Sequence, residues 1–337
     1  MNSPNPAVTP DVAGTGTIRR AIVVLGMHRS GTSAVAGCLQ RLGVELGPRL
    51  MPATEANRKG YYEHIDVVNL HDRLLMTLGL GWDSVAPWPA DWQERDSSHV
   101  FRQKLAGMLG RDFGNTPLWG IKDPRLCRLL PWWEPLWPLL GTDPIFLIVV
   151  RDPRRVAASL QRRDGISQTK ALVLWWQYML AAERDTRGRQ RFFLDFTGFA
   201  ENWSVSLKPL ATVLGEGWLA SLSRSRDENQ GFLGGFSQTA VPLAINEALW
   251  TSGLKSVWDW FKAQCGRVSS GECLGIDDSS AKEWVRDALL GQSESESISD
   301  IGIELQNARK LGAWYQAEWN KAADRAAKYK ARGSASK

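Results

Sequence analysis

The residues best suited to chemistry stand between an apolar run and a helix pattern near the start of the chain. The run AIVVLG over residues 21–26 ends at a glycine, and GMHRSGTS continues from that glycine to residue 33. A glycine-bounded turn between strand and helix points backbone N–H groups at one position, where the helix dipole adds positive charge. The turn therefore predicts a phosphate site. Its candidate residues are Gly26, His28, Arg29, Ser30, Gly31, Thr32 and Ser33.

The spacing of this turn matches the nucleotide-binding P-loop with one departure. Thr32 stands where the P-loop has a lysine. In kinases and ATPases that lysine neutralises the β- and γ-phosphates alongside Mg²⁺, so its absence argues against triphosphate chemistry. Arg29 supplies a cation from another position of the turn. A turn of this kind suits a donor with a single 5′-phosphate whose bond to the transferred group breaks in the reaction.

A second basic block follows another apolar run. IFLIVV predicts a buried strand, Arg151 comes directly after it, and Ser159 stands eight residues further on. Arginine offers phosphate a bidentate fork, and Ser159 would lie on a helix that begins at Pro153. Both blocks stand at carboxyl ends of predicted strands, where open α/β sheets bind ligands. The neighbouring Arg154 and Arg155 are expected on a solvated face of that helix.

Together the blocks resemble the sulfotransferase family, whose members transfer a sulfuryl group from 3′-phosphoadenosine 5′-phosphosulfate (PAPS). GMHRSGTS is similar to the family's 5′-phosphosulfate loop, in which Lys or Arg precedes Ser-Gly-Thr, and Arg151 with Ser159 is similar to its 3′-phosphate motif. GIKDPR, which contains Lys122, resembles a Lys-Asp-Pro segment of protein-tyrosine and some bacterial glycan sulfotransferases. The resemblance covers about residues 20–215, and FFLDFTGFAENW departs from the family's Tyr-Glu-Asp-Leu.

The resemblance implies that the two phosphate motifs bind PAPS and its product PAP and that no metal is required. Arg29 and Lys122 would stabilise charge on the leaving phosphate oxygen. A general base must take the proton of the acceptor hydroxyl, and KGYYEH holds candidates for it. Glutamate bases of related families follow the first helix, which favours Glu63. His64 and His28 are the alternatives.

The acceptor is expected to be a glycan or a glycolipid, because the long segment 43–63 resembles bacterial sulfotransferases thought to act on them. Trp82, Trp88 and Trp92 stand in the proline-rich stretch GWDSVAPWPADW, which predicts a loop near the acceptor. Their rings could stack on the acceptor or, the favoured interpretation, anchor the loop to the core. Four other tryptophans lie in apolar helical patterns and are expected in the core: Trp132, Trp133, Trp175 and Trp176.

The elements that must position these residues follow a β-then-α order. Short apolar runs predict strands buried on both faces of a parallel sheet, and caps and apolar periodicity predict helices between them. The expected fold is a P-loop-like three-layer α/β structure with a central parallel sheet and an added α-helical C-terminal region. The expected strands are 21–26, 118–121, 145–150 and 192–196, and the expected helices are 33–42, 65–78, 98–109, 153–162 and 167–188.

Composition excludes several classes of protein. The 337 residues are 43% hydrophobic, which excludes disorder as the main state. The net charge of +5 suits an anionic ligand and is too dispersed to indicate nucleic acid. The four cysteines form no CxxC pair and have no nearby histidine at ligand spacing, so neither a zinc site nor a disulfide framework is expected. No apolar run approaches the ~20 residues of a membrane span, so a cytoplasmic location is expected.

Three regions are expected along the chain. The composition of residues 1–17 predicts a flexible tail and not a signal peptide. Residues 18–220 are expected to form the PAPS-binding α/β domain, and residues 221–337 a mainly helical region. Within the last region, 277–304 carries eight acidic and two basic residues and is no anion site. A heptad-like stripe over 301–329 predicts a long amphipathic helix. This helix would pack on its own domain or form a homodimer contact.

Two other functions are compatible with the sequence. A kinase or NTPase with an atypical P-loop would show Mg²⁺-dependent hydrolysis of ATP, which Thr32 argues against. A non-catalytic binding protein on a sulfotransferase fold would use the C-terminal helix as its interaction surface. The unmatched segment FFLDFTGFAENW keeps this second alternative open.

Overall fold

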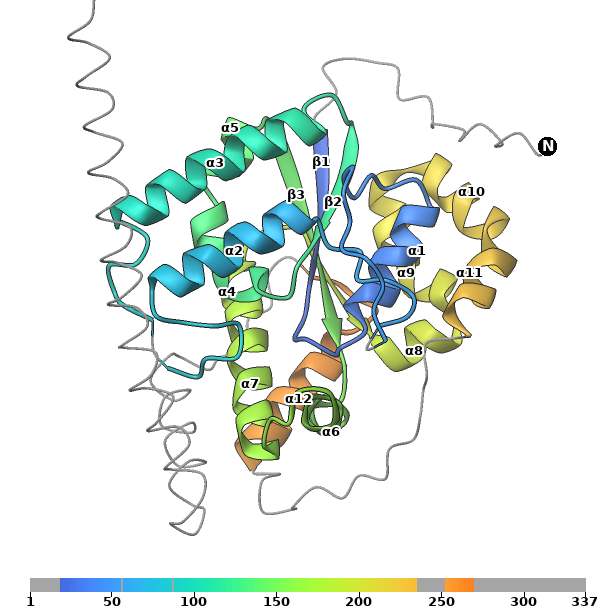
Figure 1. Ribbon diagram of the computed structural model, residues 1–337. Helices are drawn as coiled ribbons and strands as arrows, with labels where there is room; N and C mark the ends of the chain where they lie inside the picture. The colour runs from blue at the N-terminus through green and yellow to red at the C-terminus, as the bar shows by residue number, and fades with distance from the viewer. Residues whose placement is uncertain (1–18, 56, 87, 235–251, 270–337) are drawn as a thin grey trace, which may run out of the picture.

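The computed structural model describes residues 19–55, 57–86, 88–234 and 252–269 (Figure 1). Five strands within them form one sheet in the order β2-β1-β3-β4-β5. The four longer strands are parallel, and β5 adds two residues antiparallel to β4. The predicted α/β class with a central parallel sheet is confirmed. The strands are β1 (Arg19–Leu25), β2 (Leu118–Lys122), β3 (Thr142–Val150), β4 (Arg191–Asp195) and β5 (Val268–Ser269).

Helices cover both faces of this sheet. Figure 1 shows α2, α3, α4 and α7 on one side of the strands and α1, α9, α10 and α11 on the other. The described helices are α1 (Thr32–Arg41), α2 (Ile65–Thr77), α3 (Asp96–Phe113), α4 (Leu126–Trp133), α5 (Leu136–Leu139), α6 (Pro153–Asp164), α7 (Gln168–Asp185), α8 (Phe196–Glu201), α9 (Trp203–Leu214), α10 (Glu216–Arg224), α11 (Arg226–Leu233) and α12 (Ser252–Gln264). None of them is long and apolar enough to cross a membrane.

Alternate residues of the central strands enter two separate cores. Val23 and Phe146 pack with α2, α3, α4, α6, α7 and α12, whereas Val24 and Leu147 pack with α1, α9 and α10 on the opposite face. Both faces of β1 and β3 are therefore buried, which explains why these strands read as continuous apolar runs. The four tryptophans expected in the core are buried in the first of these clusters.

Local signals set the boundaries of α6, which carries Ser159 of the second basic block, and of α7, which follows it. The side chain of Asp152 accepts a hydrogen bond from the N–H of Arg154 (2.9 Å), and α6 is followed by Gly165, whose φ of 70° suits a residue without a side chain. The Ser167 hydroxyl caps α7 in the same way through the N–H of Lys170. Both helix starts were predicted correctly. The strand expected to reach residue 196 ends one residue earlier, because Asp195 caps α8.

Part of the region after residue 220 belongs to the same body. Leu254, Val257 and Phe261 of α12 are fully buried in the core with α7, and β5 extends the sheet beside β4. This short strand adds to the sheet within 221–337, the region that was expected to be mainly helical. The long helix predicted over 301–329, and the dimer contact assigned to it, lie outside the described residues.

Candidate functional site

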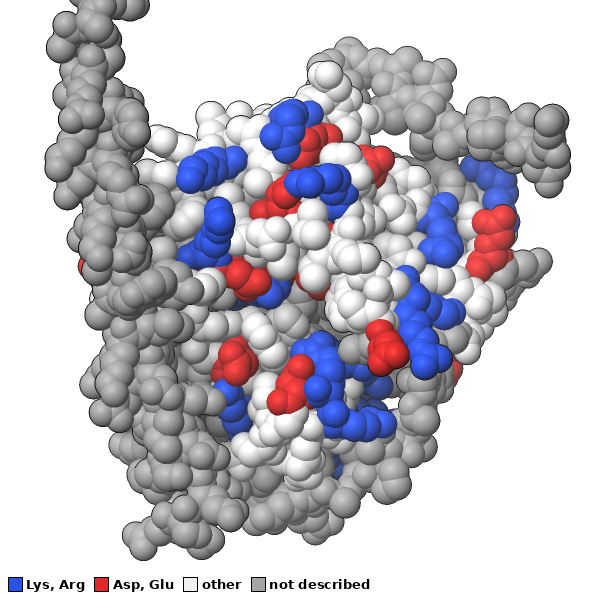
Figure 2. All heavy atoms as spheres, in the orientation of Figure 1, with Lys and Arg blue, Asp and Glu red and all other residues white. Residues whose placement is uncertain are grey.

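A cavity of about 820 Å³ lies at the carboxyl ends of the parallel strands. The turn after β1, the end of β2 and the residue after β3 all reach it, together with Phe196 after β4, Trp82 and one face of α6. Figure 2 shows Lys and Arg side chains gathered on the molecular surface near α6. Nine cations line the cavity against three carboxylates, and this excess of positive charge favours an anionic ligand. The cations are Arg29, Arg58, Lys59, Lys122, Arg125, Arg151, Arg155, Arg162 and Arg163; the carboxylates are Glu55, Glu63 and Asp164.

The backbone of the turn after β1 requires glycine at two positions. Gly26 has a φ of 141°, and a Cβ there would lie 2.8 Å from the carbonyl oxygen of Val149. Gly31 has a φ of 92°, and a Cβ there would meet the ring of Phe196. The buried N–H of Gly26 is satisfied by the sulfur of Cys127 at 3.1 Å. The turn is thus fixed by its neighbours from three other segments.

Three residues from the two predicted blocks converge beside this turn. The Nε of Arg29 donates to the Ser159 hydroxyl at 2.9 Å, and Nη1 of Arg151 donates to the Arg29 carbonyl oxygen at 2.7 Å. Burial, followed by the charge of Arg29, lowers the pKa of Arg151 to about 10, and burial also lowers the pKa of Arg29. Both groups stay charged at neutral pH. An anion between them would replace lost hydration and relieve their repulsion.

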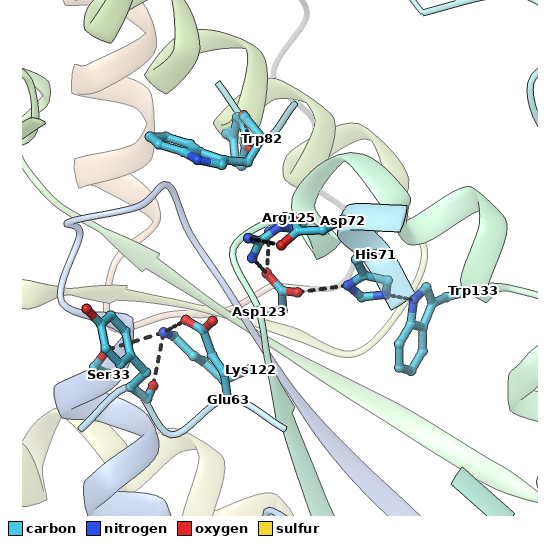
Figure 3. Close-up of polar contacts among 11 residues, drawn as sticks. Ser33, Glu63, His71, Asp72, Trp82, Lys122, Asp123, Arg125 and Trp133 are labelled. Carbon is cyan, nitrogen blue, oxygen red and sulfur yellow. Dashed lines mark hydrogen bonds and ion pairs between the residues drawn. The ribbon is translucent and has the colours of Figure 1, made fainter. Parts of the chain in front are cut away.

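The second cluster of predicted residues joins the end of β2 to the segment before α2 (Figure 3). Lys122 donates to the carboxylate of Glu63, to the Ser33 hydroxyl (3.2 Å) and to the Tyr61 carbonyl oxygen (3.1 Å). Lys122 is 3% exposed and Glu63 is 5% exposed. Burial raises the pKa of Glu63, although the charge of Lys122 opposes this. The candidate base and the candidate cation therefore face each other beside the turn after β1.

A buried network behind Lys122 was not predicted from the sequence. Trp133 donates to Nε2 of His71 (2.9 Å), so Nδ1 of His71 carries the proton and donates to Asp123 (2.8 Å). Arg125 contacts the other oxygen of Asp123 at 3.0 Å and forms a two-fold contact with Asp72 (Figure 3). Burial would raise the pKa of Asp123, but Arg125 and His71 outweigh it and hold the pKa well below its usual range. The network fixes the segment that follows Lys122.

Replacing Asp123 with alanine is expected to lower the free energy of unfolding by about 3–5 kcal/mol, because it leaves the His71 N–H and part of Arg125 unpaired in a buried site. Urea denaturation measures this. The matched control is Asp72→Ala, whose half-exposed side chain should cost about 1 kcal/mol or less. Since folding lowers the pKa of Asp123, its contribution is full above the ordinary value of 3.8 and is lost on acidification. Equal losses in the two variants would contradict this assignment.

Some predicted residues do not reach the cavity. Gly26 and Ser30 support the turn from within, and neither is part of the cavity lining. His64 is buried with its Nε2 3.1 Å from Asp112 and is also outside the lining, so the structure does not support it as the base. His28 does line the cavity, with its ring 4.3 Å from that of Trp82, and burial lowers its pKa well below the usual value.

Other residues at the cavity were missed or assigned differently. Arg155, expected on a solvated face, lines the cavity with Ser159, Arg162 and Arg163. Their spacings of four and three or four residues place them on one face of α6, so helical periodicity could have identified them. The segment between α1 and α2 also contributes several residues, of which Lys59 and Tyr61 stand in KGYYEH and the others in no motif of the sequence analysis. They are Met51, Glu55, Asn57, Arg58, Lys59 and Tyr61.

The three loop tryptophans separate in the structure. Trp92 is buried, and Trp88 packs against it at 4.9 Å between ring centroids and lies under Arg128. These two anchor the loop, as the favoured interpretation expected. Trp82 lines the cavity, and its carbonyl oxygen accepts a hydrogen bond from the Tyr178 hydroxyl. One aromatic side chain of this loop is thus placed to contact a ligand.

Comparison with family profiles finds no profile that matches the chain, and comparison with curated proteins finds no matching relative. The chemistry open to the site follows from its residues. Basic groups from the ends of β1, β2 and β3 surround one cavity, and a buried carboxylate stands beside a lysine within it. Such a site can bind phosphate or sulfate esters, take a proton from a hydroxyl group and stabilise negative charge on a leaving oxygen.

Proposed function

We propose that the protein is a sulfotransferase of P-loop-like fold, which transfers a sulfuryl group from PAPS to a hydroxyl group of an acceptor. The observation that carries this proposal is the convergence on one cavity of three blocks that resemble the family's motifs. Arg29 of the turn, Arg151 after β3 and Lys122 at the end of β2 all line it. Lys122 and Arg151 each follow Arg29 by more than 90 residues in the sequence, yet all three line the cavity where a doubly phosphorylated donor would need them.

In the proposed arrangement the turn holds the 5′-phosphosulfate through its N–H groups and Arg29, while Arg151 and Ser159 hold the 3′-phosphate. Glu63 accepts the proton of the acceptor hydroxyl as its oxygen forms the new bond to sulfur. The bond between sulfur and the bridging phosphate oxygen breaks at the same time, and Arg29 and Lys122 stabilise the charge on that oxygen. PAP and the sulfated acceptor are the products.

The acceptor is proposed to carry a ring that the aromatic side chains of the cavity can contact. Trp82 and Tyr61 line the cavity near the turn, and aromatic rings stack on the apolar faces of sugars and phenols. This agrees with the glycan or glycolipid acceptor that the resemblance implies. The acceptor would approach from the side of the segment that carries Glu63.

The direct test is transfer of radioactive sulfate from labelled PAPS to polysaccharides, glycolipids and phenols, with EDTA present in parallel reactions. We expect labelled product from at least one class, and the same yield with EDTA, because the cations of the cavity replace a metal ion. Hydrolysis of ATP that depends on Mg²⁺, without sulfate transfer, would instead support an atypical NTPase. Binding of neither PAP nor PAPS would remove the proposal.

A further inference from the structure

The side chain of Asn57 has an unusual place among the residues around the cavity, because it contacts the phosphate turn itself. Its Nδ2 donates to the Gly60 carbonyl oxygen (2.6 Å) and to the Ser33 hydroxyl (3.2 Å). A carbonyl oxygen only accepts, so the Gly60 contact fixes which end of the amide bears the hydrogens. The group that faces Ser33 is therefore a donor.

Ser33 receives a second donor from the opposite wall. The ammonium group of Lys122 lies 3.2 Å from its oxygen and has no acceptor function. A serine hydroxyl has two lone pairs and one proton. With Asn57 and Lys122 on the lone pairs, the proton of Ser33 is left to donate, and no acceptor for it occurs in the part of the chain that the structure describes.

The segment that carries Asn57 is held in place by its own contacts. The N–H of Met51 bonds the carbonyl oxygen of Glu63 (2.8 Å) and closes the base of the segment. Thr54 and Asn57 exchange two backbone hydrogen bonds, and the Thr54 hydroxyl contacts that of Tyr61 at 2.7 Å. The amide of Asn57 is thus positioned by backbone structure and does not depend on a ligand.

We infer that Asn57 is a positioning residue that, together with Lys122, makes the Ser33 hydroxyl a donor only, so that the phosphate turn binds a metal-free phosphoryl oxygen. The ordinary P-loop uses the hydroxyl at this position as a ligand of Mg²⁺, which requires a free lone pair. Here both lone pairs are occupied by donors. The choice of PAP as ligand rests on the proposed function, whereas the geometry of the hydroxyl does not.

A double-mutant cycle tests whether Asn57 acts through Ser33. The dissociation constants of PAP and of inorganic pyrophosphate are measured by calorimetry for the wild type, Asn57→Ala, Ser33→Ala and the double variant, each with Mg²⁺ and with EDTA. Loss of a hydrogen bond to a charged oxygen should weaken binding about tenfold in Ser33→Ala. Asn57→Ala should weaken it about three- to tenfold, and the double variant should be no weaker than Ser33→Ala.

A second substitution sharpens the direction of the effect. In Asn57→Asp the new carboxylate can only accept, so the Ser33 hydroxyl donates its hydrogen bond to the carboxylate and not to the ligand. The affinity for PAP and pyrophosphate should therefore fall further than in Asn57→Ala. The control Thr54→Val removes only the side-chain contact with Tyr61 and keeps the two backbone hydrogen bonds that position Asn57, so it should bind like the wild type. Unchanged melting temperatures of the unliganded variants separate this effect from unfolding.

The outcomes separate the inference from the proposed function. If the fold-losses of affinity in the two single variants multiply in the double variant, Asn57 does not act through Ser33, and the inference is overturned. A requirement of the wild type for Mg²⁺, or an unaltered affinity of Ser33→Ala, would overturn the donor-only hydroxyl. If pyrophosphate binds and PAP does not, the proposed function fails while the pyrophosphate cycle still decides the inference. If neither ligand binds, both fail.

Discussion

Replacing Glu63 with glutamine is expected to suppress sulfuryl transfer by about 10²–10⁴-fold while PAP binds as before. The amide has nearly the shape of the carboxylate but cannot take a proton from the acceptor. Lys122 keeps its contacts to Ser33 and to the Tyr61 carbonyl oxygen, so the turn should stay in place. Turnover of PAPS with the best acceptor, and calorimetry with PAP, measure the two effects separately.

The pH profile gives an independent signature of the same residue. Because the base works when deprotonated and burial raises the pKa of Glu63, the rate should rise with pH through a midpoint above its ordinary value of 4.5. The exposed control Glu94→Gln should keep both the rate and the profile. Transfer at the wild-type rate in Glu63→Gln would exclude this carboxylate and direct attention to His28, the other predicted base that lines the cavity.

Replacing Arg151 with alanine is expected to weaken PAP binding by at least about 100-fold. The substitution removes a cation that can hold phosphate through two parallel hydrogen bonds, and it also frees the Arg29 carbonyl oxygen at the bend of the turn. Arg151→Lys should recover only part of the affinity, since an ammonium group lacks the planar fork. Calorimetric titration with PAP measures the affinity of each variant.

The matched control lies three residues further along the same chain segment. Arg154 forms a two-point contact with Asp152 and is not part of the cavity lining. Arg154→Ala should therefore bind PAP within about twofold of the wild type, even if α6 loses a surface ion pair. A similar loss of affinity in both variants would mean that general basicity, and not the position of Arg151, holds the ligand.

The sequence predicts the four longer strands and the backbone of the turn after β1 well because their signals are local. A strand buried on both faces is an uninterrupted apolar run, and the caps at Asp152 and Ser167 are visible in two or three residues. The positive φ of Gly26 and of Gly31 is likewise a property of the turn's own backbone, whereas their close contacts with Val149 and Phe196 are not visible in the sequence. Each of these features depends on residues that are neighbours in the chain.

The parts that the sequence does not predict depend on pairing across the fold. Asp123 meets His71 from 52 residues away, and no spacing rule connects β2 with α2. The position of Asn57 follows from an irregular segment whose shape is set by contacts with Ser33 and its own backbone. Glu63 and His64 show that neighbours in the sequence can also be separated by the fold. Glu63 faces the cavity, whereas the ring of His64 faces Asp112.

The order of the strands has a consequence for how the site is assembled. β1 lies between β2 and β3, so the turn that follows it gains Lys122 from one neighbouring strand and Arg151 from the other. No contiguous fragment that lacks either neighbour contains the complete set of cations. A ligand held by all three strand ends therefore acts as a cross-link between them. Its binding free energy stabilises the packing of β1, β2 and β3 against unfolding, as well as the conformation of the turn.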